Sequence, residues 1–257
     1  MKSDAKSTIE TGKAILGIEL GSTRIKAVLI DQENKPIAQG NHTWENQLVD
    51  GLWTYSIEAI WSGLQDCYAD LRSNVKNLYG IEIENLAAIG VSAMMHGYMP
   101  FNAKEEILVP FRTWRNTNTG RAAAALSDLF VYNIPLRWSI SHLYQAILDN
   151  EAHVKDIDFL TTLAGYVHWQ LTGEKVLGIG DASGMLPIDP ATHNYSAEMV
   201  AKFDKLIAPN QYNWTLQDIL PKVLSAGESA GVLTPEGSKK LDASGHLKAG
   251  IPVCPPE

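Results

Sequence analysis

A Gly-Ser-Thr turn near the amino terminus could hold a phosphate group. Gly21, Ser22 and Thr23 come directly after an apolar stretch that carries one acid, Glu19. Such a turn exposes consecutive backbone N–H groups and two hydroxyls, which suit an anion such as the phosphates of a nucleotide. The Glu19 carboxylate could hold Mg²⁺ beside them, directly or through water. An ordinary hairpin with a Gly-Ser turn has the same pattern, and the spacing alone leaves both interpretations open.

A histidine stands just after a predicted strand over residues 86–92. The end of a strand is the usual place for a ligand in an α/β sheet. His96 could donate a hydrogen bond to a hydroxyl of a substrate, and Gly97 would let that ligand approach the backbone. A histidine buried in the core after the strand is equally compatible with this pattern.

Two further clusters combine polar residues with aromatic or small ones. Residues 112–116 place Trp114 between two arginines, which suits sugar recognition but equally suits a network inside the domain. Residues 180–184 contain Asp181 and Ser183, which could bind a ligand or only shape a turn. The sequence contains no Walker A loop, no HExxH motif and no Cys/His cluster, which argues against a P-loop nucleotide site and a zinc site.

Composition narrows the possible partners. Of the 257 residues 45% are apolar, which is ample for a core, and 21 basic against 29 acidic residues give a net charge of −8. An acidic chain is a poor electrostatic match for nucleic acid or an anionic membrane, although backbone amides can still bind phosphate. Because no apolar run resembles a signal peptide or a membrane span, we expect a cytoplasmic protein.

The elements that must position these residues follow from apolar periodicity. Residues 1–13 are expected to form a loose tail, and the remainder one compact domain with an inserted helical half. Strands are predicted over residues 14–20, 23–31, 36–44 and 86–92, with a short one over 250–254. Helices are predicted over residues 54–78, 119–130, 139–150, 160–171, 196–207 and 235–243. Three meander strands, a helix and a further strand predict a mixed α/β sheet.

Taken in order, these segments resemble the N-terminal domain of the FGGY family of carbohydrate kinases. GIELGSTRIKAVLID at 17–31 is similar to the family's first phosphate motif, although Glu19 stands where the family has Asp. VSAMMHGYMPF at 91–101 is similar to a Ser-x-x-Met-His-Gly segment of xylulokinases. Similar segments follow at 112–126, where the family's Trp-x-Asp-x-Arg lacks its acid here, at 159–189 and at 249–257.

The resemblance implies a ribonuclease-H-like α/β fold, that of the actin, sugar-kinase and heat-shock ATPase superfamily, with helices flanking a mixed sheet. It implies ATP-dependent, Mg²⁺-assisted phosphorylation of a sugar. The phosphates would meet Gly21, Ser22, Thr23 and Lys26, and Glu19 would act on the metal indirectly. The substrate would meet Met95, His96, Trp114 and Asp181. Met-His at this position favours a ketopentose-like substrate over glycerol. Whether the protein forms a homodimer is left open by the resemblance.

The family's kinases are roughly twice as long as this chain. Residues 14–257 would therefore correspond to the N-terminal domain, without the second domain that holds adenosine. The family's catalytic base, an Asp, would come just after Glu257, so no catalytic residue is expected in this chain and the chain alone is expected to be inactive. The alternative is a non-catalytic ATP-binding or sugar-binding member of the same superfamily.

Overall fold

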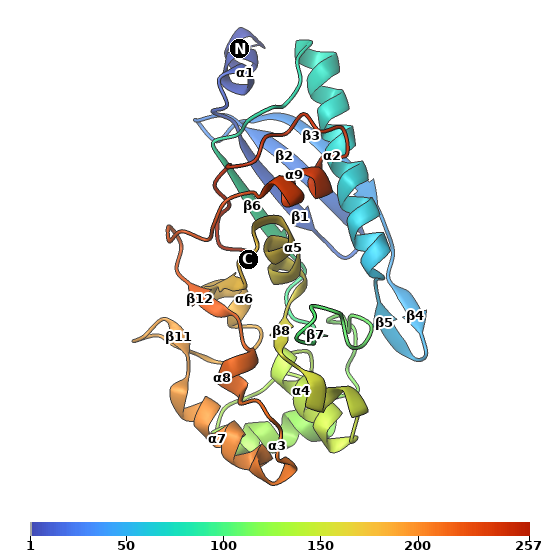
Figure 1. Ribbon diagram of the computed structural model, residues 1–257, viewed down its shortest axis with the longest axis vertical. Helices are drawn as coiled ribbons and strands as arrows, with labels where there is room; N and C mark the ends of the chain where they lie inside the picture. Colours follow the sequence, from blue (N-terminus) through green and yellow to red (C-terminus); the bar gives the residue numbers. More distant parts are fainter. Residues whose placement is uncertain (1) are drawn as a thin grey trace.

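A four-stranded mixed sheet forms one end of the molecule, and an elongated helical half forms the other (Figure 1). The structure, a computed structural model, describes residues 2–257. The strand order is β3-β2-β1-β6, in which β1–β3 run antiparallel and β6 runs parallel to β1. The strands are β1 (Ile15–Leu20), β2 (Arg24–Ile30), β3 (Pro36–Thr43) and β6 (Ala88–Ala93). The mixed sheet predicted from the sequence is confirmed.

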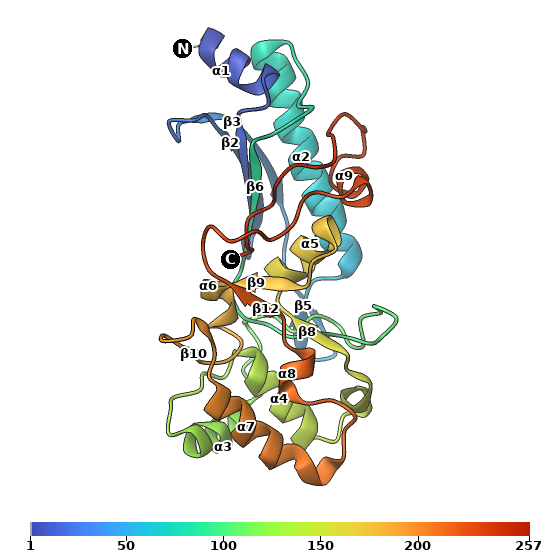
Figure 2. The ribbon, with the colours of Figure 1, turned by 60° about the vertical axis from the view of Figure 1, so that its left-hand side comes forward.

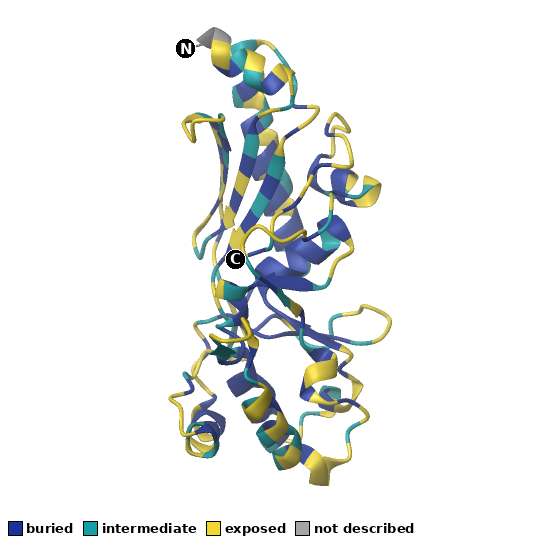
Figure 3. Cartoon of the chain, turned by 90° about the vertical axis from the view of Figure 1, so that its left-hand side faces the viewer, coloured by how far each residue is buried: buried dark blue, intermediate teal, exposed yellow. Residues whose placement is uncertain are grey.

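One face of this sheet is covered by helices and the other is open. Helix α2 (Ile57–Tyr79) begins at Ser56, whose hydroxyl accepts a hydrogen bond from the Ala59 N–H, and packs on β2 and β3. Figure 2 shows α2, α5 (Leu163–Thr172) and α9 (Pro235–Leu241) on the same side of the sheet. Burial alternates along the strands (Figure 3), as expected for a sheet with one covered face and one open face.

Both ends of the chain pack against this sheet. The structure differs from the predicted loose tail, because Lys2–Glu10 form helix α1, whose Ile9 is 2% exposed and belongs to the core. Met1 lies outside the described residues. At the other end the predicted strand is reduced to isolated bridges, among them Ile89 with Val253. The Glu257 N–H still donates to the Val91 carbonyl at 3.0 Å, so this segment runs along β6.

The second half is built on its own apolar core. The predicted helix over 160–171 begins later, because Phe159–Thr161 form strand β8 paired with β7 (Met99–Phe101). The Thr162 hydroxyl then accepts from the Gly165 N–H and starts α5. The other helices are α3 (Gly120–Phe130), α4 (Ser139–Leu148), α6 (Ile179–Ala182), α7 (Ala197–Ile207) and α8 (Leu216–Ile219), with 3-10 turns at Ala152–Asp156 and Ala208–Asn210.

Short strand pairs complete this half and join it to the sheet. They are β4 (Gln47–Val49) with β5 (Leu52–Thr54), β9 (Val176–Gly178) with β12 (Lys222–Leu224), and β10 (Ile188–Asp189) with β11 (Asn194–Tyr195). Among residues 2–257, no helix has the length and apolar character needed to cross a membrane.

Candidate functional site

The two parallel strands β1 and β6 end at the same edge of the sheet. Leu20, the last residue of β1, is in register with Ala93, the last residue of β6. The Met94 N–H donates to the Leu20 carbonyl at 2.9 Å, which extends the pairing by one residue. The turn that follows β1 and the loop that follows β6 therefore lie side by side. Carboxyl ends of neighbouring parallel strands are where α/β sheets bind their ligands.

In the turn after β1, the three backbone carbonyls accept hydrogen bonds, whereas two of the backbone N–H groups make none. The Gly21 carbonyl accepts from the Trp44 indole at 2.7 Å, and the Ser22 carbonyl accepts from the Tyr55 hydroxyl at 2.5 Å. The Thr23 carbonyl accepts from the Trp44 N–H at 3.2 Å. Within residues 2–257, the N–H groups of Ser22 and Thr23 have no acceptor. The turn can therefore offer these two donors to an anion.

Trp44 and Tyr55, the two side chains that hold this turn, were not selected from the sequence. Their rings stack with centroids 4.1 Å apart, and Asn46 donates to the Tyr55 hydroxyl at 2.8 Å. They lie beyond the first hairpin and reach the turn only through the fold. In the sequence, each of these aromatic residues stands at an end of a predicted strand or helix. Many residues share that position, so it does not identify a binding site.

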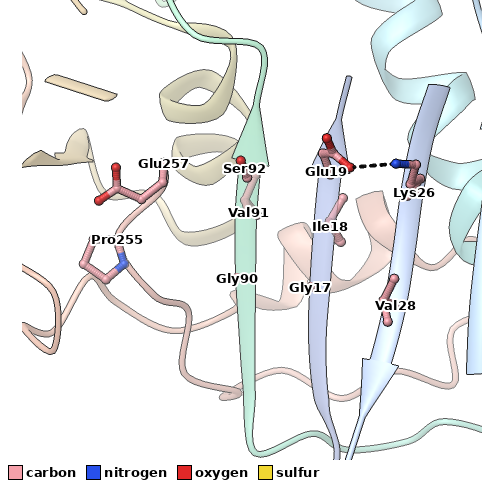
Figure 4. Close-up of a pocket in the computed structure, with 10 residues that line it drawn as sticks. All are labelled: Gly17, Ile18, Glu19, Lys26, Val28, Gly90, Val91, Ser92, Pro255 and Glu257. Carbon is pink, nitrogen blue, oxygen red and sulfur yellow. Dashed lines mark hydrogen bonds and ion pairs between the residues drawn. The ribbon is translucent and has the colours of Figure 1, made fainter. Parts of the chain in front are cut away.

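Glu19 and Lys26 face each other on the open side of the sheet. They are directly opposite in the β1–β2 register, and the Lys26 Nζ lies 3.3 Å from the Glu19 carboxylate. About half of each side chain is exposed. Both line a pocket of about 450 Å³ that continues past Ser92 to Glu257 (Figure 4). From the sequence we expect Lys26 at the phosphates. In the structure Lys26 lies on β2, beyond the turn, and forms an ion pair with Glu19.

The oxygen ligands around Glu19 fit a Mg²⁺ ion that is bound mainly by water and substrate phosphates, not by the protein alone. In the described part of the chain, no group of three or more His, Cys, Asp and Glu side chains is arranged to hold a metal ion. Mg²⁺ usually keeps several waters and takes one or two carboxylates together with phosphate oxygens of the substrate. A single exposed carboxylate beside a turn with two free amides matches that pattern, whereas a closed metal cage does not.

His96 is held by the loop after β6 in a defined orientation. Its backbone is left-handed, with φ 69°, and Gly97 follows with φ 119°. The His96 Nδ1 lies 3.4 Å from the Gly184 carbonyl, which can only accept, so Nδ1 carries the proton and Nε2 is an acceptor. Burial lowers the His96 pKa, with a smaller contribution from the charge of Arg137. In this tautomer the ring offers Nε2 to a ligand as an acceptor, and the predicted contact of His96 with a substrate hydroxyl stays a prediction.

The structure divides the cluster at residues 112–116 into two parts. Arg112 is buried and pairs with the Glu151 carboxylate, and the Asn116 side chain bonds both the N–H and the carbonyl of Trp53. These residues belong to an interior network. Trp114 is only half-buried, and Tyr98 pairs with Arg112 in an antiparallel bridge that brings its segment beside the His96 loop. Trp114 and the 45%-exposed Met95 are thus available to a ligand.

Asp181 is placed differently from the expectation of a substrate contact. Its side chain is 2% exposed and accepts a hydrogen bond from the Thr162 hydroxyl. Burial is the main reason why the pKa of this carboxyl is raised to about 7; the Thr162 hydrogen bond opposes the rise and the charge of Glu257 adds to it. Its backbone N–H donates to the Glu257 carboxylate at 3.0 Å, and the Glu257 carbonyl accepts from the Ala93 N–H. The backbone of Asp181 reaches the sheet edge, whereas its carboxylate points into the protein.

Comparison with known proteins places these features in a family. The chain is 20% identical to the xylulose kinase of Escherichia coli (strain K12) over 231 residues, which cover 87% of this chain and 45% of that protein. The structure is similar to the ligand-bound xylulose kinase of Lactobacillus acidophilus, with TM-score 0.77, 18% identity, and coverage of 95% of this chain and 48% of that one. The gluconate kinase of the same species gives TM-score 0.76, 18% identity, and coverage of 94% and 47%.

These likenesses extend over nearly the whole chain. The structural similarity confirms the predicted sugar-kinase fold. The chain spans about half the length of the curated relatives it matches. Residues 14–255 match the N-terminal domain of one family, so the chain belongs to the FGGY family of carbohydrate kinases.

Proposed function

We propose that this chain provides the sugar-binding and phosphate-binding half of an ATP-dependent kinase that phosphorylates a ketopentose-like sugar. One observation carries the proposal. The parallel register of β1 and β6 places the unpaired amides of Ser22 and Thr23 beside the loop that holds His96. A phosphate donor and a sugar hydroxyl bound at these two places would be neighbours, which is the first requirement of phosphoryl transfer.

Each residue of the site has a role in this reaction. The amides of Ser22 and Thr23 bind phosphate oxygens, and the Glu19 carboxylate would hold Mg²⁺ through water. Bound Mg²⁺ and ATP would supply the phosphoryl group and neutralise its charge. The His96 Nε2 accepts a hydrogen bond from a sugar hydroxyl, and the face of Trp114 contacts the carbon chain of the sugar.

The rest of the reaction is assigned outside this chain. Asp181 is buried against Thr162, so it is a poor candidate for the general base that accepts the proton of the sugar hydroxyl. Because the chain spans about half of its relatives' length, we assign the base to a carboxylate following Glu257 and the adenosine pocket to a second domain. Closure of two such domains would exclude water from the phosphoryl group.

A paired glycine substitution tests the sugar site. An added Cβ at Gly184 would lie 2.6 Å from the His96 Nδ1, whereas at Gly120 it would meet nothing within 4 Å. In the kinase that joins this chain to its second domain, Gly184→Ala should raise the KM for the sugar about tenfold or more, because it displaces the ring that binds it. Gly120→Ala should leave the KM unchanged.

The assay is ADP release measured over a panel of pentuloses, hexuloses and polyols. Turnover of a pentulose that Gly184→Ala impairs supports the proposal. Equal kinetic constants for both variants would remove His96 from the sugar site. Calorimetric binding of ATP and sugar without any turnover would instead support the non-catalytic alternative.

A further inference from the structure

The segment that runs up to Glu257 is held from two sides, one of which is strand β6. The Glu257 N–H donates to the Val91 carbonyl at 3.0 Å, and the Glu257 carbonyl accepts from the Ala93 N–H at 2.9 Å. In parallel pairing, one residue bonds in this way to the residues before and after its neighbour on the adjacent strand. Glu257 therefore lies beside Ser92, next to the edge at which β1 and β6 end.

The pairing before this point is irregular. Val253 is bridged to Ile89, so the segment has one residue more than β6 between its two pairing points. Pro255 and Pro256 lie in this stretch and have no N–H to donate to the strand. The Pro256 carbonyl accepts instead from the Gly178 N–H at 2.8 Å. An extra residue disrupts the ladder locally, so a further contact is needed to fix the register that follows.

The Glu257 side chain makes that contact, against the start of α6. Its Oε2 accepts from the Asp181 N–H at 3.0 Å. An added Cβ at Gly178 or at Gly180 would overlap one of the two carboxylate oxygens, so the missing side chains of both glycines make room for this group. Figure 4 shows the carboxylate pointing away from β6 and from Glu19. Glu257 is therefore not arranged to share a Mg²⁺ ion with Glu19.

The segment at residues 178–184, which contains α6, also contacts the proposed sugar site. The Gly184 carbonyl lies 3.4 Å from the His96 Nδ1 and orients the ring. The same segment thus holds both the ring that would bind the sugar and the carboxylate of Glu257. Chain that continues from Glu257 parallel to β6 passes Ala93, the last residue of β6, at its next position. The residues after Glu257 would then emerge at the strand edge beside the His96 loop.

We propose that Glu257 is a positioning residue, whose carboxylate, held at Gly178 and Gly180, fixes the register of the chain so that the catalytic carboxylate assigned beyond Glu257 meets the sugar hydroxyl. The inference rests on the proposed function, since it assumes that this later carboxylate is the general base. Glu257 itself exchanges no proton in the reaction. Its contribution is geometric, because a misplacement of about 1 Å near a reacting group can cost about 100-fold in rate.

Two substitutions remove this contact in different ways. Glu257→Ala deletes the carboxylate, and Gly180→Ala displaces it, because the atoms nearest to the new Cβ all belong to Glu257. In the kinase that joins this chain to its second domain, each should lower kcat about 10- to 100-fold. Calorimetry should show unchanged sugar affinity and unchanged stoichiometry, which reports the folded fraction. The double variant should lose no more kcat than Glu257→Ala alone, because both substitutions break the same contact.

Two further variants serve as controls. Glu257→Gln keeps an oxygen that can accept from the Asp181 N–H, so it should retain most of the kcat and the pH dependence of the unsubstituted kinase. At Gly120 an added Cβ meets nothing within 4 Å, so Gly120→Ala should change neither kcat nor sugar affinity.

Other results would overturn the proposal. If Glu257→Gln loses as much kcat as Glu257→Ala, the charge of Glu257 acts on the reaction directly. If the effects of Glu257→Ala and Gly180→Ala multiply, the two residues act separately. A fall in sugar-binding stoichiometry that matches the fall in kcat would show that Glu257 only supports folding.

The same assay separates this inference from the proposed function. An unchanged kcat in Glu257→Ala would remove Glu257 from the reaction and leave the proposed function intact. If the unsubstituted kinase turns over no sugar, the proposed function itself is wrong, and the role of Glu257 with it.

Discussion

The Tyr55 hydroxyl donates a hydrogen bond of 2.5 Å to the backbone carbonyl of Ser22, 33 positions earlier in the chain. Together with the Trp44 indole on the Gly21 carbonyl, this bond orients the peptide units of the turn. A peptide whose carbonyl is held on one side presents its N–H on the other. The free amides of the proposed phosphate site therefore depend on an aromatic pair that does not itself touch the phosphate.

Replacing Tyr55 by Phe should weaken nucleotide binding without removing any proposed contact. Tyr55→Phe leaves the Ser22 carbonyl without its donor, so we expect a loss of about 1 kcal/mol in stability and several-fold weaker ATP binding. Tyr79→Phe is a matched control, because the Tyr79 hydroxyl also donates to a backbone carbonyl, that of Ile37 on β3. Both variants should lose similar stability in urea, but only Tyr55→Phe should weaken ATP binding by calorimetry. Equal ATP affinities would show that the turn keeps its conformation unaided.

Replacing His96 by Asn should affect sugar binding and not folding. Asn tolerates the left-handed backbone of this position, so the substitution avoids the strain that other side chains would add. Loss of the Nε2 acceptor should lower sugar affinity about tenfold. His193, exposed and also left-handed with φ 56°, offers the control His193→Asn. A large drop in melting temperature with normal sugar affinity would identify His96 as a structural residue.

Replacing Glu19 by Gln should impair turnover far more than sugar binding. The carboxylate is proposed to hold Mg²⁺, which acts on the transferred phosphoryl group. In the kinase that includes the second domain, kcat should fall at limiting Mg²⁺ while the KM for the sugar changes little. Glu19→Asp should keep activity. Stability should change by less than about 1 kcal/mol, because the ion pair with Lys26 is half exposed and screened by solvent. A Gln variant with normal kcat at limiting Mg²⁺ would place the metal elsewhere.

Asp181 should contribute stability that is lost as pH rises from about 4 to about 7. Burial raises the pKa of this carboxyl from 3.8 to about 7 in the folded protein. Across that window the folded state binds more protons than the unfolded state, so raising the pH favours unfolding. The slope is at most about 1.4 kcal/mol per pH unit.

The Asp181→Asn variant isolates this contribution. Asn keeps an oxygen that can accept from the Thr162 hydroxyl but does not titrate. In urea unfolding, the stability of wild type relative to Asp181→Asn should therefore be greatest near pH 4 and fall toward pH 7. Parallel pH profiles of the two proteins would mean that Asp181 keeps an ordinary pKa in its buried position.

Local patterns in the sequence were sufficient to predict the family and most of the longer elements, but not the short strand pairs. Alternation in residues 14–31 predicted the hairpin, since a strand with one covered face must bury every second side chain. Apolar residues at spacings of three and four predicted α2, since they form one face of a helix. The order of the motifs indicated a carbohydrate kinase. Residues 2–10 were missed as a helix, because their burial depends on packing of Ile9 against the distant sheet core.

What the sequence determined by itself was therefore the residue types at each strand end and the family to which they belong. Only the tertiary structure decided how those residues act. The tautomer of His96 depends on Gly184, 88 positions away, and the burial of the Asp181 carboxylate depends on Thr162 and the packing around α5. The start of α4 lies against the His96 loop because the Ser139 hydroxyl donates to the Gly97 carbonyl. Such contacts join residues far apart in the chain, so no spacing along the sequence records them.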